Sequence, residues 1–192
     1  QSTRMLHDLQ QQVDILYYDP ETHLVWAGTN GAGLYVFDVR QPEHIVKIPG
    51  SDNSIITALE PLDRQYMLVG TDGDGLCICA QSLQTPYIDH ITPLQLLADD
   101  SPNAPYQFPL SVVKGLLADQ GHIWVSMDIG GLAMMNPSGS LSRLTVPQQR
   151  NVSDNYVYGA DFDRDGLLWI AFNNSLACFD RSGRIIGTRK VR

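Results

Sequence analysis

The sequence predicts an all-β protein built from four similar antiparallel sheets. Three observations predict it: a short apolar motif recurs four times, each copy is followed by a turn rich in Gly, Asn or Asp, and strand-like runs outnumber helical periodicity along the chain. The 192 residues are 43% hydrophobic, which is sufficient for a packed core.

The repeated motif is centred on an aromatic or apolar residue. Trp26, Leu68, Trp124 and Trp169 hold the same position, separated by steps of 42, 56 and 45 residues. A Leu follows the central residue eight positions later in three copies and seven later in the fourth. A period of about 40–50 residues is typical of the four-stranded blades of a β-propeller.

Each copy is expected to contain four strands. The first is an apolar run, at 13–18, 55–59, 112–117 and 156–162. The Trp strand and the Leu strand follow, joined by the Gly/Asn turn, and a polar strand closes the unit at 44–48, 87–91, 141–145 and 184–187. Because the Trp strand is apolar on both sides, we expect its central residue to be buried between neighbouring blades.

The predicted blades are approximately 13–50, 54–91, 110–146 and 155–190, with an insertion at 92–109. Four blades leave open sheet faces, and an uncovered face or edge favours aggregation. The N-terminus also begins with Gln1. We therefore expect a fragment of a larger propeller, completed by further blades or by another copy.

Charge and cysteine content limit the partners. The formal charge of −8 disfavours nucleic acid, since phosphate backbones repel an acidic chain. Cys77, Cys79 and Cys178 are odd in number, and two residues on one strand face are poorly placed for a disulfide. Buried thiols are the favoured interpretation. No run of the sequence approaches the length of a membrane span.

The repeats resemble a known family. The pattern Asp-x-x-Gly-x-Leu-Trp-Ile-Gly-Thr, a turn, and Gly-Leu-x-x-Phe-Asp is similar to the two-component regulator propeller repeat, best matched at 24–38 and 154–180. The resemblance covers nearly the whole chain. It departs at Leu68, which replaces Trp, and at Ser126-Met127 and Ala171-Phe172, which replace Gly-Thr.

The resemblance implies a function. Members of that family place seven-bladed propellers outside the inner membrane of bacteria, ahead of a linking β-domain, a transmembrane helix and a histidine kinase or diguanylate cyclase. Many sense oligosaccharides. The resemblance therefore implies a periplasmic, non-enzymatic sensor region that binds a small molecule or glycan, needs no cofactor, and belongs to a dimeric inner-membrane receptor.

Polar turn residues are the candidate ligand-binding groups. Asn30, Asp72, Asp128 and Asn173 hold equivalent turns, and Asn53 and Asn155 lie in crossovers expected on the same rim. Amide and carboxylate groups suit sugar hydroxyls, although turns favour Asn and Asp for conformational reasons alone. Tyr106, and Phe108 beside it in the insertion, are candidates for stacking on a ligand, with an ordinary surface loop as the alternative.

One acidic motif resembles the start of a calcium loop. Asp161, Asp163 and Asp165 alternate before Gly166, but the twelfth position is Phe172 instead of a carboxylate. A hairpin turn is the favoured interpretation, and these three residues stay weak metal candidates.

Two other functions stay open at this point. A protein-interaction propeller of the WD-repeat kind has the same architecture, because a fold does not fix a function. A propeller enzyme resembling streptogramin lyase would need converging His and Glu residues with a metal, and the predicted channel positions offer Asn and Asp instead.

Overall fold

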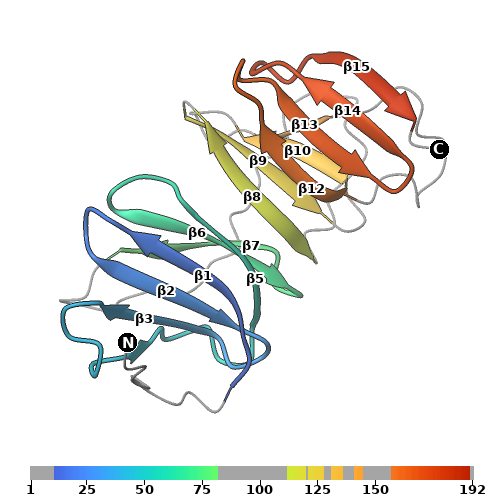
Figure 1. Ribbon diagram of the computed structural model, residues 1–192. Coiled ribbons are helices and arrows are strands. Elements are labelled where there is room, and N and C mark those ends of the chain that lie inside the picture. The colour runs from blue at the N-terminus through green and yellow to red at the C-terminus, as the bar shows by residue number, and fades with distance from the viewer. Residues whose placement is uncertain are drawn as a thin grey trace, which may run out of the picture. The chain divides into compact units, whose positions relative to one another are not determined.

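The computed structural model describes residues 11–81, 112–119, 121–127, 131–135, 141–144 and 157–190, the range 141–144 by its backbone alone. These residues form β-strands joined by turns (Figure 1). The chain divides into two compact units, Gln1–Leu94 and Gln95–Arg192, each with two sheets. In the described ranges, no helix has the length and apolar character of a membrane span.

The first unit contains one four-stranded sheet and one sheet with three described strands. The four-stranded sheet has the order β1-β2-β3-β4, and its strands are β1 (Val13–Asp19), β2 (Leu24–Thr29), β3 (Leu34–Asp38) and β4 (Val46–Lys47). The other sheet consists of β5 (Ile55–Pro61), β6 (Tyr66–Asp72) and β7 (Leu76–Ala80). The strand predicted at 87–91 lies outside the described residues.

The second unit repeats this arrangement with two four-stranded antiparallel sheets. One has the order β11-β10-β9-β8, formed by β8 (Val113–Asp119), β9 (His122–Met127), β10 (Gly131–Met135) and β11 (Leu141–Leu144). The other is formed by β12 (Val157–Phe162), β13 (Leu168–Phe172), β14 (Ser175–Phe179) and β15 (Ile185–Lys190). The predicted insertion at 92–109 lies outside the described residues.

The register of the repeat is the same in all four sheets. Trp26 lies opposite Tyr17 on β1 and Val36 on β3, and the other three central residues hold the same position in their ladders. Every first strand also contains a bulge at the same place. The ladder passes over one residue in each, and these bulge residues are Asp14, Thr57, Lys114 and Tyr158.

The turn after the central strand is built twice in the same way in the first unit. The Thr29 hydroxyl donates to the Gly33 carbonyl at 2.7 Å and accepts from the Ala32 amide at 3.0 Å. Thr71 makes the equivalent bonds in the next sheet. Gly33 has a φ of +87°, and a Cβ there would overlap the Ser51 carbonyl oxygen. Only glycine therefore fits without displacing this backbone.

An apolar core lies between the two sheets of each unit. In the first unit, Trp26 packs in a cluster with residues of both sheets, including Ile56, Met67 and Val69. In the second, Trp124 packs with Leu168, Ile170 and Phe179 of the following sheet. Trp26 and Trp124 are 1% and 2% exposed, so the prediction of a buried central Trp is confirmed at these two positions.

Trp169 departs from that prediction, because 42% of it is exposed. Its strand neighbours Leu168 and Ile170 face the preceding sheet. Alternate residues of a strand point to opposite faces, so the Trp169 side chain lies on the other face of its sheet, which no described sheet of the second unit covers.

The three cysteines are free and buried, as predicted. Cys77 and Cys79 share one face of β7 and lie in the core of the first unit. Burial raises the pKa of both thiols to about 12, and it also raises the pKa of the Cys178 thiol. These thiols therefore act as small apolar side chains at neutral pH.

Candidate ligand site

The structure places three predicted rim residues at one end of the first unit. Asn30 follows β2 and forms an isolated bridge with Ile55. The crossover that contains Asn53 binds both neighbouring turns, because the Ser54 carbonyl accepts from the Gly33 amide and the Ser54 hydroxyl donates to Asp74. Asn30, Asn53 and Asp72 are exposed there. Ligand binding by these side chains stays a prediction.

Of the other rim candidates, one is described by the structure and the rest are not. Asn173 is exposed in the turn between β13 and β14 of the second unit. Tyr106, Phe108, Asp128 and Asn155 lie outside the described residues. Asn53 has a φ of +66°, a backbone conformation in which Asn is several-fold enriched, so its residue type has a conformational cause as well.

The acidic motif of the fourth repeat is a hydrogen-bonded turn. One Asp163 oxygen accepts from the amides of Asp165 and Leu167, each at 2.9 Å, and the other accepts from the Trp169 indole N–H at 2.8 Å. These bonds lower the pKa of the Asp163 carboxyl. No three His, Cys, Asp or Glu side chains gather as metal ligands within the described ranges.

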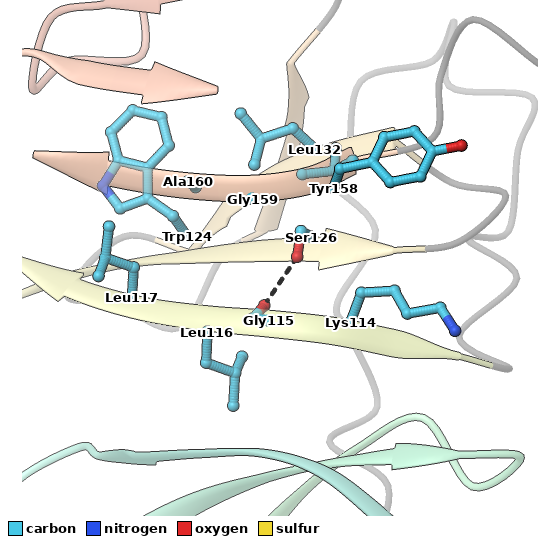
Figure 2. A pocket seen from close by; sticks show the side chains of 11 residues that line it. Lys114, Gly115, Leu116, Leu117, Trp124, Ser126, Leu132, Tyr158, Gly159 and Ala160 are labelled. Carbon is cyan, nitrogen blue, oxygen red and sulfur yellow. Dashed lines mark hydrogen bonds between the residues drawn. The ribbon is translucent and has the colours of Figure 1, made fainter. Parts of the chain in front are cut away.

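A cavity lies between the two sheets of the second unit, where their first strands β8 and β12 run beside each other (Figure 2). It has a volume of about 80 Å³, and we call it the seam cavity. It is lined by Lys114, Gly115, Leu116 and Leu117 of β8, Trp124 and Ser126 of β9, Leu132 of β10, and Val157, Tyr158, Gly159 and Ala160 of β12.

Small residues open this cavity where large residues fill the first unit. By ladder position, Gly115 corresponds to Ile15 and Ala160 corresponds to Leu59. Ile15 and Leu59 both pack in the core of the first unit. The replacement of these two branched side chains by Gly and Ala therefore removes side-chain volume between the two sheets of the second unit.

The residues opposite Ile15 and Gly115 in the ladder also differ in size between the two units. Gly28 lies opposite Ile15, and a Cβ on Gly28 would lie 2.5 Å from the Ile15 Cγ2 atom. At the equivalent position of the second unit, Ser126 lies opposite Gly115 and donates its hydroxyl to the Gly115 carbonyl at 3.2 Å. In the first unit this pair therefore consists of a large residue, Ile15, and a glycine, Gly28. In the second unit it consists of a glycine, Gly115, and a small hydroxyl residue, Ser126.

The two ends of the seam cavity differ in polarity. Trp124 and Leu117 lie at one end, and the bulge residues Lys114 and Tyr158 lie at the other (Figure 2). Trp124 is buried, whereas Lys114 is exposed and 70% of Tyr158 is exposed. The cavity therefore has an apolar interior and a mouth that carries an ammonium group and a phenol.

This arrangement is suited to binding. The lining contains no His, Cys, Asp or Glu among the residues that the structure describes. The sequence prediction missed this site because it searched for polar turns. The signal was present in the repeat itself, as small residues at two positions that are large in the first unit.

The sequence matches no protein-family model and none of the curated proteins. The resemblance to a propeller repeat family therefore stays a sequence-level prediction.

Solved structures do match the fold. One is described as the extracellular domain of a one-component system, BT4673, from B. thetaiotaomicron, with 17% identity over 95% of this chain and a TM-score of 0.67. Another is described as the extracellular domain of a hybrid two-component system, BT3049, from the same organism, with 19% identity over 90% of this chain and a TM-score of 0.66. This chain spans 22% and 23% of those two chains.

A third match is the β-propeller domain of Cps50 (Swd1) from Myceliophteria thermophila. It shares 14% identity over 95% of this chain and 56% of its own length, with a TM-score of 0.65. Identities this low describe the fold alone. Together with the four antiparallel sheets, they identify the chain as a run of β-propeller blades that fits a part of a propeller.

Proposed function

We propose that this chain is part of the extracytoplasmic sensory propeller of a bacterial signalling receptor of the one-component or hybrid two-component kind. The observation that carries the proposal is the fold likeness to two extracellular domains of such systems over 90–95% of the chain. In this role the region binds a signal and catalyses no reaction, and the receptor is anchored in the inner membrane.

We also propose that further blades complete the propeller. Three side chains support this: Trp169 is 42% exposed on one sheet, and Leu16 and Tyr18 are 66% and 48% exposed on another. They alternate with residues that pack in the two cores, so they lie on the faces that these cores leave uncovered. Additional sheets would bury them as the cores bury Trp26 and Trp124.

The finer elements of the proposal come from the repeat resemblance. The first is an oligosaccharide signal, bound by the exposed turn residues Asn30, Asn53, Asp72 and Asn173, which we call the polar rim. The second is a dimeric receptor whose two copies change their packing when the signal binds. Exposed amide and carboxylate groups at Asn30, Asn53 and Asp72 support the choice of a hydroxyl-rich ligand, since the amides donate and accept hydrogen bonds and the carboxylate accepts them.

A topology experiment tests the cellular location. Alkaline phosphatase, which is active only outside the cytoplasm, is fused after residue 192 in the gene as its native host carries it. We expect high phosphatase activity and no fluorescence from the matching green fluorescent protein fusion. The reverse pattern would contradict the proposal.

A second experiment tests the sensory role. Trp124→Ala is introduced into the same chromosomal gene, because it disrupts the core of one unit, and transcripts are compared with the parent strain during growth on individual glycans. We expect loss of induction of a defined gene set on one glycan. Unchanged transcripts on every glycan, with normal levels of receptor, would argue against signalling by this region.

A further inference from the structure

We propose that the seam cavity binds a short aliphatic carboxylate, with the hydrocarbon tail inside the cavity and the carboxylate at Lys114 and Tyr158. The inference rests on the proposed sensory function, because the bound acid would be a signal for the receptor. It differs from the glycan signal expected at the polar rim, since it concerns another part of the fold and another chemistry.

The size of the cavity limits the part of the ligand that enters it. Its volume is about 80 Å³, which is roughly half that of the engineered apolar cavity of about 150 Å³ that holds benzene. A chain of about three carbon atoms therefore fits, while a sugar ring does not. The group inside the cavity is consequently smaller than any pyranose.

The walls of the cavity favour hydrocarbon over hydroxyl groups. Trp124, Leu132 and Val157 are buried and apolar. The Ser126 hydroxyl is also buried, but it already donates its hydrogen to the Gly115 carbonyl. A buried hydroxyl of a ligand would lack partners at most of this surface, which is costly. An alkyl tail has no such requirement.

The mouth of the cavity favours an anion. Lys114 supplies a positive charge and has no ion-pair partner among the residues that the structure describes. Tyr158 supplies a hydroxyl that can donate to a carboxylate. Both residues are at the β-bulge of their strand and lie at the same end of the cavity (Figure 2). The Lys114 ammonium group is thus a local attraction for an anion on a chain whose net charge of −8 otherwise repels anions.

The test is a titration of the full 192-residue chain with acetate, propionate, butyrate and hexanoate at constant ionic strength and neutral pH. The readout is the indole N–H signal of Trp124 in a ¹H–¹⁵N spectrum, with those of Trp26 and Trp169 as internal controls. We expect a saturable shift of the Trp124 signal with a Kd for butyrate on the order of 1 mM, as for other ligands of this size.

The dependence on chain length adds a second criterion. Each methylene group that enters an apolar site strengthens binding about fourfold. We therefore expect affinity to rise from acetate to butyrate and to stop rising at hexanoate, when the cavity is full. Affinity that does not change with chain length, or the absence of a saturable shift, would overturn the proposal.

Two variants separate the charge from the cavity. K114Q is expected to weaken butyrate binding about fivefold, the size expected for an exposed ion pair, while leaving the binding of the neutral alcohol butanol unchanged. K47Q in the first unit is the matched control and should bind butyrate as the parent chain does. Equal butyrate affinity in K114Q and K47Q would contradict the role of Lys114.

The double variant G115I/S126G restores the residue pair that fills the first unit, Ile15 and Gly28. It is expected to abolish binding of butyrate and butanol while the urea midpoint stays at or above that of the parent chain. Undiminished binding in a folded double variant would place the ligand elsewhere and overturn the proposal.

A neutral oligosaccharide serves as the final comparison. If maltohexaose shifts signals of the polar rim and butyrate does not shift Trp124, the carboxylate proposal fails while the sensory function stands. If butyrate binds as described but the receptor is located in the cytoplasm, the sensory function fails while the binding site stands.

Discussion

Trp26 and Trp169 occupy the same ladder position in their sheets, yet they are 1% and 42% exposed. Trp26 is covered by the following sheet of its unit. The indole of Trp169 lies on an uncovered face, where its N–H donates to Asp163. One residue type at one position therefore has two energetic roles, which depend on whether another sheet packs on it.

The first prediction compares these two tryptophans. Trp26→Ala should lower the free energy of unfolding by on the order of 3–5 kcal/mol, because it empties a buried site. Trp169→Ala should cost roughly 1 kcal/mol in the same chain. Urea denaturation followed by circular dichroism measures both. Equal losses would show that register position alone, and not burial, determines the cost.

The second prediction concerns the turn glycines. Gly33→Ala should destabilise the protein by about 2–4 kcal/mol, because its φ is +87° and the new methyl group would contact the Ser51 carbonyl. Gly31→Ala is the matched control: φ is +93°, but nothing lies within 4 Å of the added Cβ, so the cost should be about 1 kcal/mol. Thermal unfolding of both variants measures the difference. If Gly31→Ala were the more damaging change, contact with the Ser51 carbonyl would not be the reason for the requirement for glycine at position 33.

The third prediction concerns the pH dependence at Asp38. The side-chain hydrogen bonds from Arg40 lower the pKa of the Asp38 carboxyl from 3.8 to about 2. Because the pKa is lower in the folded state, this pair stabilises the fold above about pH 4 and loses that contribution as the pH falls to about 2. Carboxyl-carbon NMR titration of the parent chain measures the pKa directly.

The matched variant for this pair is Arg40→Gln, which should return the Asp38 pKa toward 3.8. Asp180 provides an internal reference, since its pKa is lowered mainly by Ser182 and should not respond to the variant. An Asp38 pKa that is the same with and without Arg40 would show that the ion pair does not form in solution.

The fourth prediction concerns thiol reactivity. With a pKa of about 12, only about one Cys77 or Cys79 side chain in ten thousand is a thiolate at pH 8. We expect iodoacetamide to label neither residue in the native chain on a timescale at which glutathione is consumed, and to label all three cysteines in urea. Tandem mass spectrometry distinguishes the sites, because Cys77 and Cys79 lie on the same tryptic peptide. Rapid labelling of Cys79 under native conditions would contradict its buried position.

Much of the fold was predictable because the repeat fixes spacing as well as residue type. The step from Trp26 to Leu34 places a hairpin between them, and the Gly-rich turn identifies where the chain reverses. The predicted first strand at 13–18 is observed as Val13–Asp19. The prediction of the first closing strand was less accurate: 44–48 was expected, and only Val46–Lys47 forms the edge strand, because polar edge strands carry a weak apolar pattern.

The seam cavity could not be predicted from composition, because it depends on which residues face each other between two sheets. Gly115 and Ala160 are ordinary strand residues when each is considered alone. Their significance follows from the bulge, which shifts the ladder by one residue and sets Gly115 opposite Ser126. Trp169 was predicted to be buried from the pattern of its strand, but its exposure agrees with the separate expectation that a run of four blades leaves open sheet faces.

The bulge in each first strand distinguishes a residue that takes no part in strand pairing from its neighbours, which do. Asp14, Thr57, Lys114 and Tyr158 are passed over by the ladder, whereas the residues on either side of them take part in it. Mutation at these four positions can thus alter charge, size and hydrogen-bonding capacity with little effect on the pairing of the strands. The architecture therefore allows the side chains at these four positions to differ from blade to blade while the strand pairing is kept.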